Sequence, residues 1–345
     1  MKILKRISLL SLLLVMLVTL SACGGTQEED TAATPDEAQK VTIKMAHTEA
    51  EDRTIHLACV EFKKWIEEAS KGNITVELYP NGSISGSDAD LAEAAATGTI
   101  EISVSATSAL TNYSDKFGIL DMPYLFNNEQ CAFNAIDGKL GETLNATLAG
   151  TGLKILGYSY NGVRNTTNNV RPINEPNDFN GIKMRTMQSP THIATFKAFG
   201  SNATPMSFGE VYTGLQQGTV QGQDNAASLI YAQQFYEVQK YLSLTQHNYG
   251  FMAVIANENW YNSLSEENRA LVDQGIKDYM LDYERNLEMA DNDSYIKKLE
   301  EKGMAVNSIT PENHQKFVDI VQPVYAEYAK TFGQDLFDIA LSYNK

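Results

Sequence analysis

The sequence lacks the residue patterns of the common enzyme classes. No Gly-x-Ser-x-Gly, His-Glu-x-x-His, Walker or Gly-x-Gly-x-x-Gly motif occurs in its 345 residues. Its five histidines are scattered along the chain: His47, His56, His192, His247 and His314. Their spacing predicts no metal site. We therefore predict a protein that is not an enzyme and needs no cofactor, with a secreted hydrolase as the less favoured alternative.

Positive charge is also scarce. The chain has 27 Lys and Arg against 43 Asp and Glu, which gives a formal net charge of −16 at pH 7. A body with this charge is repelled by nucleic acid and by anionic lipid. We predict no nucleic-acid partner.

Only one long apolar run is present, from Ile7 to Leu20, and basic residues precede it. The run is too short to span a membrane and has the flanks of a secretory signal. The residues that follow, Leu-Ser-Ala-Cys, resemble a lipobox, in which the thiol of Cys23 is diacylated and becomes the mature N-terminus. We therefore predict a lipoprotein signal peptide at residues 1–22, with an ordinary signal peptide as the alternative.

Residues 23–40 have the composition of a flexible tether, because they are polar and show no apolar periodicity. The folded part is therefore expected outside the cytoplasm, lipid-anchored to the outer face of the cell membrane. Beyond Cys23 only Cys59 and Cys131 remain. They are predicted either to form one disulfide or to be buried free thiols.

The first third of the folded chain alternates strand and helix patterns. Strands are expected at Lys40 to His47, Ile74 to Tyr79 and Ile100 to Val104, and helices at Ile55 to Ala69 and Asp88 to Thr97. This order predicts a parallel sheet with helices on its faces.

The central third repeats the alternation, and the last third is mainly helical. Strands are expected at Leu153 to Tyr160, Ile182 to Arg185 and Val220 to Gln223, and helices at Pro190 to Phe199, Ser207 to Gln217 and Pro311 to Phe332. A capping box is predicted at Ser207 and Glu210. Leu264 to Gly303 contains no proline and predicts a helix long enough to cross two domains, even if it is broken near Asn286 to Asn292.

Arginines gather in one segment, Asn161 to Arg185. Arg164, Arg171 and Arg185 are three of the six arginines that follow the predicted signal peptide. The planar guanidinium matches a carboxylate with two parallel hydrogen bonds. This segment therefore predicts an anion-binding site.

Several stretches together resemble the solute-binding proteins of tripartite ATP-independent periplasmic (TRAP) transporters, the dicarboxylate-binding-protein family. They include FGILDMPYLF, NGVRNTTNNVRPI, GIKMRTMQSP and PMSFGEVYTGLQQGTVQGQDNAA, and the likeness extends over Val41 to Lys345. It implies a two-lobed, periplasmic-binding-protein-like α/β fold, each lobe a mixed sheet flanked by helices, with a long helix spanning both lobes. Lobe I is predicted at 41–161 plus about 251–291, and lobe II at 162–250 plus about 292–345.

The resemblance also implies the ligand-binding residues. Arg185 matches the arginine that forms the family's main salt bridge to the ligand carboxylate, and Arg164 matches a second anion contact. Asn225 matches a pocket asparagine, and Phe208 matches an aromatic pocket wall. By contrast, Arg171 matches no pocket position and is predicted to be a surface charge.

Two residues of the first lobe, His47 and Asp88, lie near where that lobe faces the cleft in the family. The alternatives are that Asp88 caps a helix and that His47 is a satisfied side chain at a strand end. Ala106 stands where sialic-acid binders carry an acidic residue, which argues against sialic acid.

We therefore expect a monomeric receptor that captures a small organic acid and delivers it to the small and large permease subunits of a TRAP transporter. A receptor of an ABC importer or of a sensor kinase is the alternative. Two arginines fit a C4-dicarboxylate, whereas Asn161, His47 and Asp88 would suit the hydroxyls of a sugar acid.

Overall fold

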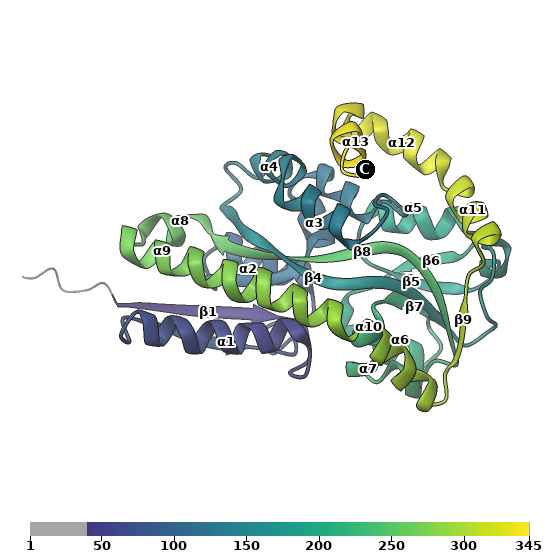
Figure 1. Cartoon of the computed structure of the whole chain (residues 1–345), viewed down its shortest axis with the longest axis horizontal. Coiled ribbons are helices and arrows are strands. Elements are labelled where there is room, and N and C mark those ends of the chain that lie inside the picture. Colours follow the sequence, from purple (N-terminus) through teal and green to yellow (C-terminus); the bar gives the residue numbers. More distant parts are fainter. Residues whose placement is uncertain (1–39, 345) are drawn as a thin grey trace, which may run out of the picture. The chain divides into compact units, whose positions relative to one another are not determined.

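The computed structural model describes residues 40–344 (Figure 1). The predicted signal peptide, Cys23 and nearly all of the predicted tether lie outside these described residues. Within residues 40–344, no helix is both long enough and apolar enough to cross a membrane.

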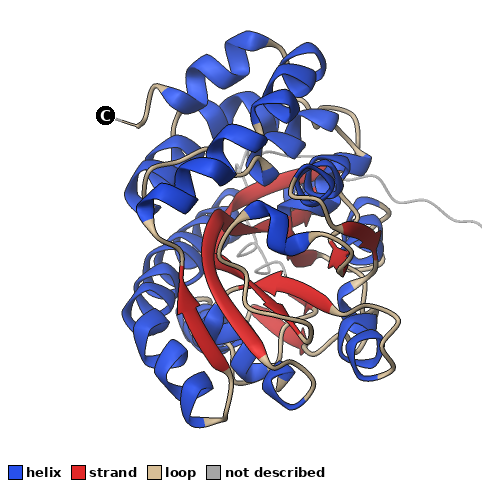
Figure 2. Cartoon of the chain, turned by 90° about the vertical axis from the view of Figure 1, so that its right-hand side faces the viewer, coloured by secondary structure: helices blue, strands red, loops and turns tan. Residues whose placement is uncertain are grey.

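The strands form one mixed sheet in the order β2-β1-β3-β8-β4-β7-β5-β6, with β9 paired to β8, and helices lie on both sides of it (Figure 2). The strands are β1 Val41–His47, β2 Ile74–Tyr79, β3 Ile102–Ala106, β4 Leu153–Asn168, β5 Lys183–Thr186, β6 Asn202–Pro205, β7 Gly222–Asn225, β8 Tyr241–Asn257 and β9 Ala305–Ser308.

The helices are α1 Thr54–Ala69, α2 Asp88–Ala96, α3 Glu129–Asp137, α4 Lys139–Ala146, α5 Pro190–Ala198, α6 Val211–Gln216, α7 Ala227–Ala232, α8 Glu258–Ser263, α9 Glu266–Gly275, α10 Glu284–Glu301, α11 Pro311–Ile320, α12 Gln322–Phe332 and α13 Gln334–Leu341. Short turns that bear on the site are η1 Thr107–Asn112, η2 Asp115–Asp121 and η4 Phe208–Glu210. The predicted fold class, a two-lobed α/β protein with a mixed sheet and flanking helices, is confirmed.

Strands β4 and β8 form a long antiparallel ribbon that joins the two halves of the sheet. At one end β8 pairs with β3, and at the other end β4 pairs with β7. The register of the ribbon shifts between Tyr160 and Val163. Gly162, at this bulge, has a φ of +79° and leaves no room for a Cβ beside Ala226. The ribbon is therefore irregular where it passes from one half of the sheet to the other.

The predicted long helix is present. Helix α9, a π-helical segment at Ile276–Tyr283 and α10 follow one another without interruption. The distortion lies at this π-helical segment and not near Asn286 to Asn292. The π-helical part contacts α1, whereas α10 contacts α7 and β9, so the long helix bridges elements of both predicted lobes (Figure 1).

Two predicted helices differ from the structure. The helix expected at Ser207 to Gln217 is the short turn η4 followed by α6, and the Ser207 hydroxyl contacts the Glu210 carboxylate instead of capping a backbone N–H. The helix expected at Pro311 to Phe332 is divided at Val321, because Pro323 has no N–H to donate to the preceding turn.

The last helices pack on residues of predicted lobe I. Phe332 and Phe337 share one core cluster with Phe117 and Leu140, and α12 and α13 contact η2 and α4. Helix α12 also contacts α5 of predicted lobe II, and α11 contributes to a core cluster with residues of that lobe. The lobe boundaries therefore stay a prediction.

The two described cysteines are free thiols. Cys59 and Cys131 are both buried. Burial raises the pKa of the Cys59 thiol, so it stays protonated at neutral pH. Of the two alternatives, the structure therefore has buried thiols.

Candidate functional site

Two adjoining cavities lie where elements of both halves of the sheet meet. The first has about 350 Å³ of empty space and is lined by Asp88, Arg185 and Phe208, among others. The second has about 250 Å³ and is lined by Arg164 and by residues of β3, η1 and η2. Ser108 and Met187 line both cavities, so the two are neighbours.

Arg185 is a buried cation without a carboxylate partner. It lies on β5, and only 4% of it is exposed. Its Nε and Nη2 both donate to the carbonyl of Met206, at 3.1 and 2.9 Å. Burial lowers the pKa of Arg185 to about 10, so it remains charged at neutral pH. No described carboxylate forms an ion pair with it, so its charge is available to an anion in the first cavity.

Asp88 and Phe208 both line the first cavity. Asp88 begins α2, and its carboxylate accepts a hydrogen bond from Thr48 Oγ1 at 3.1 Å. Burial raises the pKa of Asp88 to about 6, with a further contribution from Glu49. The alternative role as a helix cap is wrong, because the Ser87 side chain caps α2.

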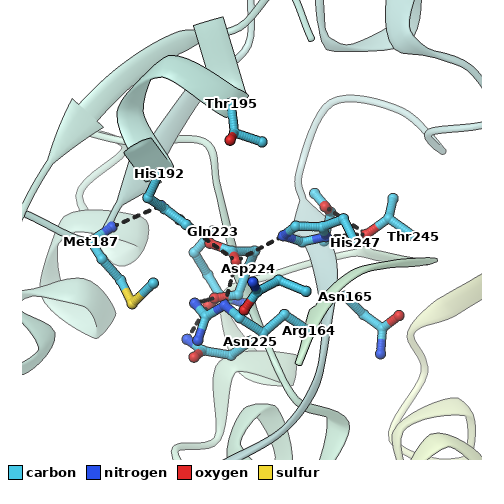
Figure 3. A network of polar contacts seen from close by, with 12 residues as sticks. Arg164, Asn165, Met187, His192, Thr195, Gln223, Asp224, Asn225, Thr245 and His247 are labelled. Atoms are coloured by element: carbon cyan, nitrogen blue, oxygen red, sulfur yellow. Dashed lines mark hydrogen bonds and ion pairs between the residues drawn. The ribbon is translucent and has the colours of Figure 1, made fainter. Parts of the chain in front are cut away.

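Arg164 is paired inside the protein. Its Nε donates to Asp224 Oδ2 at 2.6 Å, and its Nη2 donates to the Asp224 backbone carbonyl at 2.5 Å. His192 and His247 both place Nε2 at 3.1 Å from the same carboxylate oxygen (Figure 3). Although burial opposes it, Arg164 and the histidines hold the pKa of Asp224 well below its usual range. Asp224 is thus a buried carboxylate that neutralises Arg164.

One ligand atom from each of His192, Asp224 and His247 lies within 4.8 Å of the others, a spacing that a metal ion can use. The hydrogen bonds favour a different arrangement. His192 Nδ1 accepts the N–H of Met187 at 3.2 Å, so its Nε2 carries the proton and donates to Asp224. Burial lowers the pKa of His192 to about 4, which keeps the ring neutral. The cluster therefore fits a hydrogen-bonded support for Arg164 and not a metal centre.

The second cavity contains a carboxyl group that is not fully paired. Asp121, the last residue of η2, is buried, and its Oδ2 has no hydrogen-bond partner among the described residues. The Ser189 hydroxyl lies beside this carboxyl group and, with Arg164, partly offsets the effect of burial on its pKa. Burial raises the pKa of Asp121 to about 6. Nothing in the sequence distinguished this aspartate, because it lies in a turn-rich stretch without regular spacing.

Two predicted site residues line neither cavity. The Asn225 amide donates to Gln223 Oε1 at 2.6 Å, within β7. His47 is fully buried and contacts His56 at 3.1 Å, and burial lowers its pKa to about 3. Their contacts with a ligand stay predictions.

Arg171 is not a freely solvated charge. It donates to the carbonyls of Asp178 and Asn180, at 2.9 and 2.6 Å. It therefore braces a loop and lies away from the two cavities.

Sequence reasoning missed another buried arginine. Arg53, just before α1, donates to Glu49, Glu288 and Asn161, at 2.9, 3.0 and 2.7 Å. It also donates to Ser228 of α7. Glu288 lies 235 residues away in the chain, so no local pattern could have announced this pair.

The two halves of the molecule touch beside the first cavity. The N–H of Gly209, next to Phe208, donates to the carbonyl of Gly86 at 2.9 Å. A Cβ at Gly209 would lie 3.1 Å from the Gly86 Cα, and the reverse distance is 3.2 Å. This close backbone contact therefore favours glycine on both sides, because a Cβ on either residue would push the partner's backbone away.

Comparison with known proteins finds relatives that cover most of the chain. Residues 45–331 match the bacterial extracellular solute-binding protein family 7. The chain is 34% identical over 279 residues to the 2,3-diketo-L-gulonate-binding periplasmic protein YiaO of Escherichia coli K12. The matched region covers 81% of this chain and 84% of that protein.

Solved structures of two similar proteins share the fold. One is the sugar acid binding protein DctPAm of Advenella mimigardefordensis in complex with galactonate, with a TM-score of 0.86 and 30% identity over 89% of this chain and 99% of that chain. The other is a TRAP periplasmic solute binding protein of Sulfurospirillum deleyianum with bound succinate, with a TM-score of 0.84 and 28% identity over 88% of this chain and 99% of that chain. The chain therefore belongs to the bacterial extracellular solute-binding protein family 7, the family of the TRAP solute-binding proteins.

Proposed function

We propose that this protein is the extracytoplasmic solute receptor of a TRAP transporter and binds a small organic acid through a salt bridge to Arg185. The observation that carries this proposal is a buried guanidinium, free of any described carboxylate, that lines the first cavity. Burying a charge without a partner is costly, and an incoming carboxylate removes that cost with two charge-assisted hydrogen bonds.

The remaining predicted residues have supporting roles in this proposal. Phe208 covers the carbon skeleton of the acid, and Asp88 accepts hydrogen bonds from its polar groups. Arg164 adds an N–H donor from the second cavity, and Asn225 and His47 reach the ligand only after local side-chain movement. Lobes I and II close on the acid, and the contact of Gly86 with Gly209 forms on closure.

Delivery requires the small and large permease subunits in the membrane, and the receptor acts as a monomer. We propose that Cys23 carries the lipid and that the tether of residues 23–40 lets the folded part reach those subunits. Cys23→Ser should abolish incorporation of radiolabelled palmitate by cells that produce the protein. Unchanged labelling would refute the anchor and leave the binding proposal standing.

A thermal-unfolding screen against C4-dicarboxylates, aldonates, uronates and 2-oxo acids tests the binding proposal. An acid present at about 100 times its Kd should stabilise the folded protein by about 2.7 kcal/mol. Arg185→Ala should abolish this stabilisation. Lys183→Ala is the matched control, because Lys183 is an exposed cation two positions away on the same strand. An Arg185→Ala protein that binds the acid normally would refute the salt bridge.

A further inference from the structure

We infer that the ligand is a hydroxylated monocarboxylic acid of the sugar-acid type, and that Asp121 selects it by accepting a hydrogen bond from a ligand hydroxyl. The inference rests on the proposed function, since it places the acid in the cavities beside Arg185. Neither the family nor its relatives decide the point, because the similar structures hold galactonate in one case and succinate in another.

The first step is the positive charge available to a ligand. Only two of the described residues lining the cavities are cationic, Arg185 and Arg164. Arg164 is already neutralised, because Asp224 Oδ2 lies 2.6 Å from its Nε and the carboxylate is fully buried. One guanidinium, that of Arg185, is therefore left for a ligand carboxylate. Each additional carboxylate would be buried without a counter-ion.

The second step is the negative charge of the walls. Asp88 lines the first cavity and Asp121 lines the second. Both carboxyl groups are largely ionised at neutral pH, since the pKa of each is about 6. A second ligand carboxylate would therefore meet two aspartates as well as a neutralised arginine. This distribution of charge disfavours a C4-dicarboxylate.

The third step is the kind of hydrogen bond that the residues lining the cavities can form with a ligand. An ionised carboxylate only accepts hydrogen bonds, and Asp121 Oδ2 is buried without a hydrogen bond to the described residues, although the Ser189 hydroxyl lies beside the carboxyl group. Succinate at neutral pH has no donor to offer. A hydroxyl supplies one, and it also accepts from neighbouring donors such as the Ser108 hydroxyl that lines both cavities.

The geometry also separates the two ends of the ligand. Arg185 lines the first cavity and Asp121 the second, and Ser108 and Met187 line both cavities. A carboxylate on Arg185 therefore leaves the rest of a short carbon chain to extend toward Asp121. An acid that carries hydroxyls along this chain satisfies both ends at once.

The test is isothermal titration calorimetry of the mature protein with D-gluconate, D-galactonate, D-glucuronate and succinate. The wild-type protein should bind at least one of the three hydroxy acids roughly tenfold or more tightly than succinate. Asp121→Asn is nearly isosteric. It should weaken the binding of that hydroxy acid by about tenfold or more, and it should leave the affinity for succinate unchanged or increase it. Asp115→Asn is the matched control, because Asp115 is an exposed aspartate of the same turn, η2.

Asp88→Asn provides an independent arm in case the Asp121 variant fails to fold, which circular dichroism without ligand would reveal. Asp88→Asn should also reduce the preference for the hydroxy acid over succinate. Preference of the wild-type protein for succinate would overturn the inference, as would equal losses for both classes of acid in Asp121→Asn. If Arg185→Ala abolishes succinate binding in that case, the proposed function stands and only this inference fails. If no acid binds the wild-type protein, both fail.

Discussion

Two buried arginines of this protein stand in opposite electrostatic surroundings. Arg53 is enclosed by Glu49 and Glu288, with Glu284 nearby, and donates to each of the first two. Arg185 is buried to a similar degree but donates only to a backbone carbonyl. The Arg53 guanidinium contacts two carboxylates, whereas the Arg185 guanidinium contacts no described carboxylate.

The difference separates a structural charge from a functional one. A buried ion pair holds its elements in place, because removing one partner leaves the other uncompensated. Arg53 ties the start of α1 to α7 and α10 in this way. A buried charge without a partner does not stabilise the fold, and its presence is understandable if a ligand supplies the partner. Burial alone therefore does not distinguish the two roles. They are distinguished by whether a carboxylate of the protein contacts the buried arginine.

The largest effect is expected from Arg53→Met, which keeps an apolar stem but removes the charge. We expect the free energy of unfolding to fall by about 3–5 kcal/mol, because Glu49 and Glu288 would be buried without a cation. Urea denaturation followed by circular dichroism measures the loss. Lys63→Met, which removes a partly exposed pair with Glu67 on the same helix, should cost less than about 1 kcal/mol. Equal losses of unfolding free energy in the two variants would show that the buried ion pairs of Arg53 stabilise the fold no more than an exposed pair does.

Arg185→Met should give the opposite pattern. Without ligand, the free energy of unfolding should stay within about 1 kcal/mol of the wild type, because the variant removes a buried charge that has no counter-ion. With the bound acid at about 100 times its Kd, the stabilisation of about 2.7 kcal/mol should disappear. Denaturation curves with and without ligand measure both quantities. A loss of 3 kcal/mol or more without ligand would place Arg185 in the same structural class as Arg53.

The contrast between the two arginines also marks how far the sequence could predict the structure. Local patterns located β1, α1, β2 and the long helix, because apolar periodicity and stop signals act over a few residues. The resemblance to a family located Arg185, Asp88 and Phe208 at the cavity. Arg185 and Phe208 lie in segments whose sequence is characteristic of the family, whereas Asp88 was placed only by its position near the cleft.

The sequence patterns could not predict contacts between segments that are far apart in the chain. The pairing of Arg164 with Asp224 depends on β4 lying beside β7, and the histidines that complete the cluster come from α5 and β8. Arg53 was missed for the same reason. A sequence gives the number of arginines, but only the fold decides which of them are already neutralised.

The carboxylates around Arg53 predict a pH dependence. Burial, together with Glu288, raises the pKa of Glu284 to about 8, above its usual value. The folded protein therefore holds a proton that the unfolded chain releases, so stability is lost as the pH rises toward 8. Between pH 6.5 and 8 the free energy of unfolding should fall by up to about 2 kcal/mol. This window lies above the pKa values of Asp88, Asp121 and His192.

Glu284→Gln tests this assignment, because an amide does not titrate. Urea denaturation of the variant at pH 6.5 and pH 8 should give nearly the same free energy of unfolding. A variant that keeps the full pH dependence of the wild type would show that another group is responsible. Since Glu284 lies beside Arg53 and not in either cavity, ligand affinity at pH 6.5 should be preserved.

The smallest effect is expected at the contact between Gly86 and Gly209. A methyl group on either residue would lie 3.1–3.2 Å from the partner's backbone and would hold the two sides of the first cavity apart. Gly209→Ala should therefore weaken acid binding by about tenfold, or about 1.4 kcal/mol, without changing the free energy of unfolding in the absence of ligand. Calorimetric titration measures the affinity. Because both methyl groups disturb one contact, the double variant with Gly86→Ala should be little weaker than either single variant. Additive losses would mean that the two glycines act separately and that their contact does not help to close the site.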